Sequence, residues 1–298
     1  MKTTKYRLYT SVLLAFAGGT LFFSSCKKDE EIEEPEQTEE VKVRPITTQS
    51  SAYVTQLFDY TPGPGQFVNT AFGDADAAKT VLNGKQGLVS LGSYGGNIVL
   101  GFDHTVLNQS GKEDIVIYNN ASATFAEPGV VWVMQDVNSN GKPDDIWYEL
   151  SGSAQNSAGY TRNYSITYTR PSSPANEVSW TDNLGNSGSV KTNTFYKQAY
   201  YPVWITANTY TLTGTLLPSS NINNAGIITS TPFTFGYADN SAGSDKLDIA
   251  NAIDEKGNKV ALKGIDFIKI QTGIPYNLGL LGELSTEVKG IADISIEK

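Results

Sequence analysis

Apolar and polar residues alternate along most of the chain between residues 46 and 298. Tyr164, Ile166 and Tyr168 alternate with Ser and Thr, and the segment 209–216 repeats the pattern with Thr at every second position. A period of two is typical of strands that bury one face. Runs that are apolar throughout, at 98–100, 115–117 and 130–134, indicate strands buried on both faces.

Helix signals are scarce. The segment 74–82 has Asp74 as a candidate N-cap, an Ala-rich middle and Gly84 beyond its end, and 248–253 predicts one more helical turn. Further strands are expected at 233–235, 260–262 and 267–270, and Gly, Asn, Ser and Asp fill the connections. The pattern predicts an all-β fold, a jelly-roll-type β-sandwich, in a single large domain over residues 46–298.

The apolar run at the N-terminus differs from these strands. Three basic residues precede the mostly apolar segment 8–23, and small residues then lead to Cys26, the only cysteine. This order is typical of a lipoprotein signal peptide, and the run is too short for a membrane-spanning helix. We therefore expect residues 1–25 to be removed after export and Cys26 to be lipidated, which leaves it unavailable for a disulfide, a metal or catalysis.

Residues 26–45 are predicted to be a disordered linker. Beyond Cys26 the segment contains eight acidic residues and two prolines but no aromatic residue, so it cannot bury enough apolar surface to fold. Removal of the signal changes the formal net charge from −9 to −12, because it removes three basic residues and no acidic one. An acidic chain without a basic cluster excludes nucleic acid as a partner, and the lipid anchor supplies the membrane attachment.

One loop has the spacing of a calcium site. Residues 136–144 match the first nine positions of a calcium-binding loop, with oxygen ligands expected from Asp136, Asn138, Asn140, the Lys142 carbonyl and Asp144. The match ends at position twelve, where Trp147 replaces the usual Glu, so Asp145 or Glu149 would have to supply that carboxylate. The alternative is a hairpin turn with solvated carboxylates. A bound Ca²⁺ would have a structural role.

Other polar residues carry weaker signals. The acidic segment 239–245, with Asp248 and Asp254, indicates either a loop metal site or caps for the next helical turn, and capping is favoured. His104 is the only histidine, so a Ser-His-Asp triad would require it; a loop histidine bonded to the backbone is the favoured interpretation. Several carboxylates could pair for glycoside hydrolysis, but no local context selects Glu113, Asp114, Glu127 or Glu177.

Aromatic residues crowd the segment 193–204. Five of the ten residues from 195 to 204 are aromatic, and Trp180 precedes them. Some of these rings must belong to the core, whereas others at loop tips would form a platform for a sugar ring or a corrinoid face, with Asp and Asn as hydrogen-bond partners. The candidate ligand-binding residues are Trp180, Asp182, Tyr196, Tyr200, Tyr201 and Trp204.

Several motifs occur in an order that resembles a known family. They include Tyr60–Asn69, Gly101–His104, Glu127–Val130, Asp136–Leu150, Gly236–Asn240 and Gly282–Glu287. Over residues 53–296 the chain is similar to Bacteroidota cell-surface lipoproteins, which are often encoded beside TonB-dependent transporters, including those for corrinoid uptake. The resemblance implies a jelly-roll-like sandwich, and Lys28–Glu31 looks like the surface-export signal of such lipoproteins. It supplies no catalytic residues.

These observations favour a surface-exposed outer-membrane lipoprotein that binds a small molecule for a TonB-dependent uptake system. The favoured cargo is a corrinoid resembling vitamin B12. A carbohydrate-binding lipoprotein of a glycan-uptake system is the alternative, because it shares every sequence feature except the genomic neighbourhood. A β-sandwich hydrolase ranks lower, since the chain has one histidine, no free cysteine and no nucleophile-elbow motif; we expect no enzymatic activity.

Overall fold

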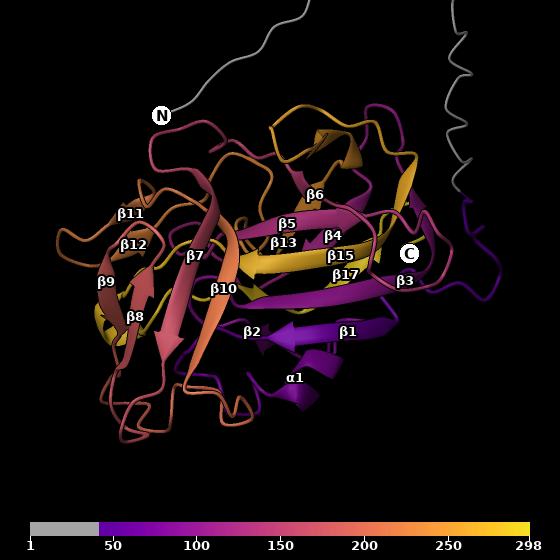
Figure 1. Ribbon diagram of the computed structural model, residues 1–298. Helices are drawn as coiled ribbons and strands as arrows, with labels where there is room; N and C mark the ends of the chain where they lie inside the picture. Colours follow the sequence, from indigo (N-terminus) through magenta and orange to yellow (C-terminus); the bar gives the residue numbers. More distant parts are fainter. Residues whose placement is uncertain (1–41) are drawn as a thin grey trace, which may run out of the picture. The chain divides into compact units, whose positions relative to one another are not determined.

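Two antiparallel sheets packed face to face form the centre of the fold in the computed structural model, which describes residues 42–298 (Figure 1). The larger sheet has six strands in the order β1-β3-β15-β5-β6-β14. Their bounds are Gln56–Thr61 for β1, Asn97–Leu107 for β3, Gly264–Thr272 for β15, Gly129–Met134 for β5, Trp147–Leu150 for β6 and Ala252–Ile253 for β14. The smaller sheet has the order β13-β4-β17, with bounds Ser244–Leu247, Ile115–Tyr118 and Gly290–Asp293.

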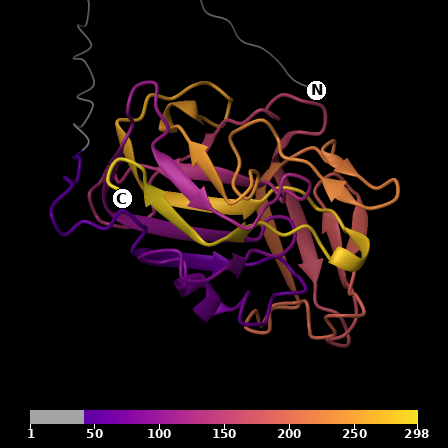
Figure 2. The ribbon, with the colours of Figure 1, turned by 180° about the vertical axis from the view of Figure 1, so that it is seen from behind.

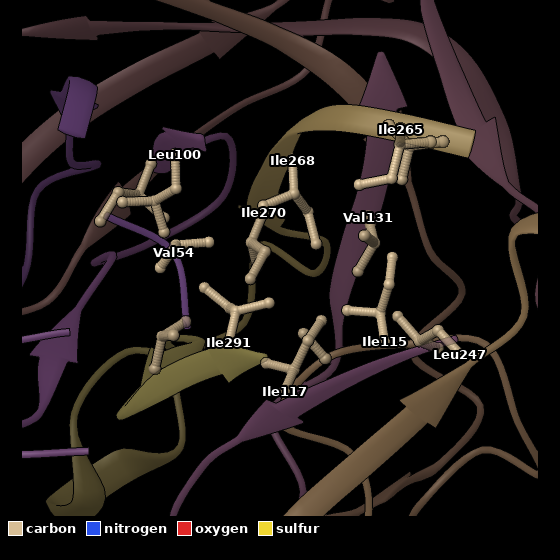
Figure 3. Packing of buried hydrophobic residues seen from close by; sticks show 14 of the residues in the cluster. Val54, Leu100, Ile115, Ile117, Val131, Leu247, Ile265, Ile268, Ile270 and Ile291 are labelled. Carbon is tan, nitrogen blue, oxygen red and sulfur yellow. The ribbon is translucent and has the colours of Figure 1, made fainter. Parts of the chain in front are cut away.

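The main hydrophobic core fills the space between these two sheets. Figure 3 shows Leu100, Ile268 and Val131 of the large sheet facing Ile117 and other aliphatic residues of the small sheet. Seen from behind, β4 and β17 cover the large sheet (Figure 2). The apolar runs at 98–100, 115–117 and 130–134 are buried as predicted, because their strands have protein on both faces.

A four-stranded sheet crosses one end of the large sheet (Figure 1). Its order is β10-β7-β8-β9, with bounds Thr209–Leu216, Thr161–Thr169, Val178–Asp182 and Ser187–Val190. The predicted alternation holds in β7, where Tyr164, Ile166 and Tyr168 are buried in a second, tyrosine-rich core. On the outer face, the Thr167 and Thr211 hydroxyls hydrogen-bond across the strands at 2.7 Å. Gly214 permits the crossing, since a Cβ there would lie 1.7 Å from the Gln271 side chain.

Short elements complete the described residues. Helix α1 (Ala75–Lys79) begins as predicted at Asp74, whose carboxylate accepts hydrogen bonds from two backbone N–H groups. The turn predicted after Asp248 is the 3₁₀ helix η1 (Ile249–Asn251), and a second one, η2, spans Gly279–Leu281. Two small pairs remain: β2 (Val89–Ser90) with β16 (Glu287–Val288), and β11 (Ile222–Asn223) with β12 (Thr229–Ser230).

The all-β sandwich is confirmed, whereas its jelly-roll topology stays a prediction. Two local predictions were wrong, since 233–235 and 260–262 are irregular. The Phe233 backbone hydrogen-bonds to the Asn240 side chain rather than to a strand. The described residues belong to one compact unit. Within residues 42–298, no helix has the length and hydrophobicity needed to span a membrane.

The N-terminal predictions fall mostly outside the described residues. The signal peptide at 1–25, the lipidated Cys26 and the linker up to residue 41 all lie there. Arg44, expected in the linker, instead belongs to the folded body: its guanidinium lies 2.9 Å from the buried Asp266 carboxylate. Its backbone also pairs with Thr105 of β3, so the ordered chain begins before residue 46.

Candidate functional site

The predicted calcium loop folds around its own carboxylates. Both Asp136 oxygens accept backbone N–H groups of the turn, from Asn140 at 3.0 Å and Gly141 at 2.9 Å. The side-chain amides of Asn138 and Asn140 donate to Asp144. Four of the five candidate residues, all except Lys142, are therefore linked through their side chains in one tight loop, and calcium binding there stays a prediction.

The two carboxylates considered for the missing position differ. Asp145 accepts the Val137 N–H at 3.0 Å, inside the loop. Glu149 is turned away from the loop, because its carboxylate accepts hydrogen bonds from the Tyr160 and Thr215 hydroxyls. Only Asp145 could complete the ligand set of this loop.

The structure separates the predicted ligand-binding aromatics. Tyr200 and Tyr201 are buried in the tyrosine-rich core, so neither presents a ring face to a ligand. The Tyr200 hydroxyl accepts the Asn193 N–H and donates to the Tyr196 carbonyl, which supports the loop in front of it. The assignment of these two tyrosines to a binding surface was wrong, because their rings pack against side chains of the four-stranded sheet in the core.

Trp180 and Asp182 also have structural roles. The Trp180 ring covers Gly188 across the β8–β9 hairpin, where a Cβ would lie 2.5 Å from it. The Asp182 carboxylate accepts backbone N–H groups of Leu184 and Asn186 in the hairpin turn. Trp204 is 41% exposed and packs near Tyr60, with the two ring centroids 6.4 Å apart.

Of the six, Tyr196 borders a cavity with several acidic side chains, whereas Trp180 borders a much smaller one, of about 10 Å³, that also includes Glu283. We call the cavity at Tyr196, of about 300 Å³, the carboxylate pocket. Its wall combines Phe67 and Tyr196, whose ring centroids lie 5.1 Å apart, with acidic side chains. The acidic residues are Glu127, Glu283 and Glu287, and Asp239 lies beside them in the protein interior.

Backbone hydrogen bonds hold the acidic segments together. The Glu127 N–H donates to the Asp239 carbonyl at 2.9 Å, and the Glu287 N–H donates to the Asp239 carboxylate at 2.8 Å. Glu127 in turn accepts the Ser285 N–H through its carboxylate. Glu283 is held separately, since both its oxygens accept the Gln66 N–H. Gly65 is required there, because a Cβ would lie 2.3 Å from the Glu283 Oε1 atom.

Burial and mutual repulsion raise the pKa values of these carboxyl groups. Burial raises the pKa of Glu283 to about 8 and that of Glu287 to about 7. Burial together with the charge of Glu287 raises the pKa values of Glu127 and Asp239 well above their ordinary range. Ion pairs elsewhere in residues 42–298 do not involve any of the four. This concentration of acidic groups without a basic partner is typical of a functional site.

The mouth of the pocket carries exposed apolar side chains. Tyr196 is 39% exposed, Leu280 71% and Leu281 50%, and Phe72 packs edge-on against Phe67. We call these residues the apolar rim. A second cavity of about 470 Å³ shares Leu280 and is lined by Asn193 and Lys197 of the predicted segment. Exposed apolar residues gathered beside a polar cavity are typical of a ligand-binding surface.

A smaller cavity of about 170 Å³ lies where the four-stranded sheet crosses the large one. Lys269, Trp132 and Glu149 form a row across β15, β5 and β6 on its floor. The Lys269 ammonium lies 4.5 Å from the Trp132 ring centroid and 5.3 Å from that of Trp147. Burial lowers the pKa of Lys269 to about 8. We call this cavity the Trp132 pocket.

His104 is buried inside β3, not in a loop, and does not bond the backbone as expected. Its two ring nitrogens lie 2.7 Å from Asp103 and 2.9 Å from Asp293. Burial by itself would lower the pKa of His104, but these hydrogen bonds outweigh it and raise the pKa. In the hydrogen bonds of residues 42–298 no serine hydroxyl reaches this ring, so the ring is not part of a Ser-His-Asp triad.

Sequence reasoning missed most of the carboxylate pocket. Its acidic residues come from three segments, at 127, 239 and 283–287, and no local spacing connects the three. One signal was present: these positions, with Gln66, fall in four of the segments that carry the family resemblance. The structure brings those four segments to one place. When the chain is compared with known proteins, no protein-family model matches it, and no curated protein is significantly similar to it in sequence.

Proposed function

We propose that the mature chain is a surface-exposed outer-membrane lipoprotein that binds a small molecule, without converting it, for a TonB-dependent uptake system. The favoured cargo is a corrinoid. The signal-like segment before Cys26, the acidic linker and the family resemblance support the location. The observation that carries the binding proposal is the carboxylate pocket opening beside the apolar rim.

The chemistry of this surface suits a broad ligand with amide groups at its edge. A corrinoid is too large to be enclosed in about 300 Å³, so it would lie across the apolar rim with its ring face on Tyr196 and Leu280. Its peripheral amides would enter the pocket and donate hydrogen bonds to Glu127 and Glu283. Apolar contact then supplies affinity, and the carboxylates supply orientation.

Calorimetric titration of the chain from residue 42 with cyanocobalamin tests the proposal. We expect micromolar or tighter binding, and we expect Tyr196→Ala to weaken it at least tenfold, about 1.4 kcal/mol. Trp204→Ala is the matched control, because Trp204 is similarly exposed but lies outside the pocket lining, and it should leave affinity unchanged. Absence of binding, or equal losses in the two variants, would contradict the proposal.

The second candidate function is capture of a glycan. The Trp132 pocket favours it, since about 170 Å³ between Trp132 and Trp147 suits a single sugar ring, with Glu149 and Arg162 as hydrogen-bond partners. A glycan panel titrated against the same protein distinguishes the two functions: glycan binding that is lost in Trp147→Ala, without corrinoid binding, selects this one. Chemical turnover of any panel member would instead identify a hydrolase.

A further inference from the structure

Three carboxylates converge behind the carboxylate pocket without a positive charge to balance them. Oxygens of Glu127, Asp239 and Glu287 all lie within 4.8 Å of one another. Two oxygens that contact one Ca²⁺ at about 2.3–2.6 Å are at most about 5 Å apart, so these three could contact a single ion. The same distances without an ion bring like charges together in a buried place, which is unfavourable.

A second, independent feature points to a missing ligand. Asp239 is fully buried, and its Oδ1 atom has no hydrogen-bond partner of normal geometry, although its Oδ2 atom accepts the Glu287 N–H. The Ala121 N–H, which also approaches Asp239, donates to the Asn119 side chain at 3.1 Å. A buried acceptor of this kind costs free energy unless a donor or a cation satisfies it. The neighbouring Glu127 and Glu287 carboxylates are acceptors when ionised, so either could donate to this atom only after taking up a proton.

We propose that Glu127, Asp239 and Glu287 bind a divalent cation, with Ca²⁺ as the best fit. Hard oxygen donors exclude the metals that prefer sulfur or imidazole. Mg²⁺ usually keeps several waters and few carboxylates, whereas Ca²⁺ accepts several protein oxygens in a flexible geometry. The Asn120 amide, which lies 3.1 Å from Glu287, fixes that carboxylate from the outside.

The site lies at the inner wall of the carboxylate pocket, because Glu127 and Glu287 line it. Its donors are held by backbone hydrogen bonds between segments around 127, 239 and 285–287. A bound cation would therefore lock these three segments together and compensate two of the three negative charges of the ionised carboxylates. This cation site is separate from the loop at 136–145, which shares no residue with it.

The test uses calcium alone, so its result does not depend on any organic ligand. Full-length chain in detergent is freed of metal with a chelator and titrated calorimetrically with CaCl₂, and its melting temperature is recorded with and without the ion. All measurements are made on the Asp144→Asn variant, which removes a predicted calcium ligand of the loop at 136–145, so that this loop does not contribute to calcium binding. In this variant we expect one Ca²⁺ to bind and to raise the melting temperature.

Adding Asp239→Asn, or separately Glu287→Gln, should weaken the remaining calcium binding at least tenfold and abolish the rise in melting temperature. Both changes keep side-chain size and remove one buried charge, so the variants should fold; circular dichroism checks this. The proposal is overturned if the Asp144→Asn protein binds no Ca²⁺ at about 10 mM, above the range of weak extracellular sites. It is also overturned if Asp239→Asn and Glu287→Gln leave binding unchanged.

Discussion

Buried charges at single residues set how this domain responds to pH. Lys269 lies under Trp132 and Trp147 with Glu149 two strands away, and burial lowers its pKa to about 8. The unfolded chain keeps this lysine protonated up to about pH 10.4, so between pH 8 and 10.4 the unfolded state binds more protons. The contribution of Lys269 to stability therefore rises with pH across this window.

Replacing Lys269 by Met removes this titration. We expect the free energy of unfolding of Lys269→Met to exceed that of the wild type most at pH 7, and the difference to shrink by about 3 kcal/mol at most by pH 10.4. Urea unfolding of both proteins from pH 7 to 10.4 measures it, and tyrosine titrations cancel in the comparison. A difference that stays constant over this range would contradict the assigned pKa.

The carboxylates of the proposed cation site show why patterns of neighbouring residues did not predict this cluster. Glu127 has no acidic neighbour in the sequence, and Asp239 stands in a segment that favours helix capping. Capping does occur, through Asp248, but Asp239 joins Glu127 and Glu287 instead. The type of a residue indicates which interactions its side chain can make. Which residue it interacts with depends on the chain segments that the fold places next to it.

At the scale of elements, turn chemistry follows the sequence closely. Asp74, Asp182 and Asp248 each accept backbone N–H groups at a helix or hairpin end. The segment 193–204 behaves differently, because it is not a strand and its rings diverge: Tyr200 enters the core and Tyr196 faces the pocket. Alternation therefore predicts burial within a strand and fails in an irregular loop.

Asp182 provides an element-scale test, since it was a candidate ligand residue. Asp182→Ala should destabilise the domain by about 1–2 kcal/mol, because the hairpin turn and the Tyr164 hydroxyl lose their acceptor. Ligand affinity should not change. Denaturant unfolding and calorimetry measure the two effects, and Asp182→Asn, which keeps one acceptor oxygen, should be milder. Loss of affinity without loss of stability would restore the binding role.

At the scale of the whole molecule, the segment around Arg44 is attached to the large sheet. Arg44 pairs with Asp266 of β15, which is 1% exposed and also accepts hydrogen bonds from Thr105 and Asp136. A chain that begins at residue 46 would leave this buried carboxylate without its basic partner. The folded body therefore includes residues that composition assigns to the acidic linker.

A protein that begins at residue 46 should be less stable than one that begins at residue 42 by about 1–3 kcal/mol, the cost of an unpaired buried acceptor and lost strand contacts. Arg44→Ala in the longer protein should reproduce most of this loss, because the guanidinium supplies the charge. Urea unfolding of the three proteins decides it. Equal stability of the two lengths would show that Arg44 is only peripherally attached.

Local patterns in the sequence determined the all-β class, the buried strands, the helix caps and the loop at 136–145, because each depends on residues close together in the chain. Only the tertiary structure decided which aromatic rings are buried and which face a cavity. It also decided that Glu127, Asp239 and Glu287 meet. Their approach is set by pairing between segments more than forty residues apart, and no periodicity in the sequence encodes such pairing.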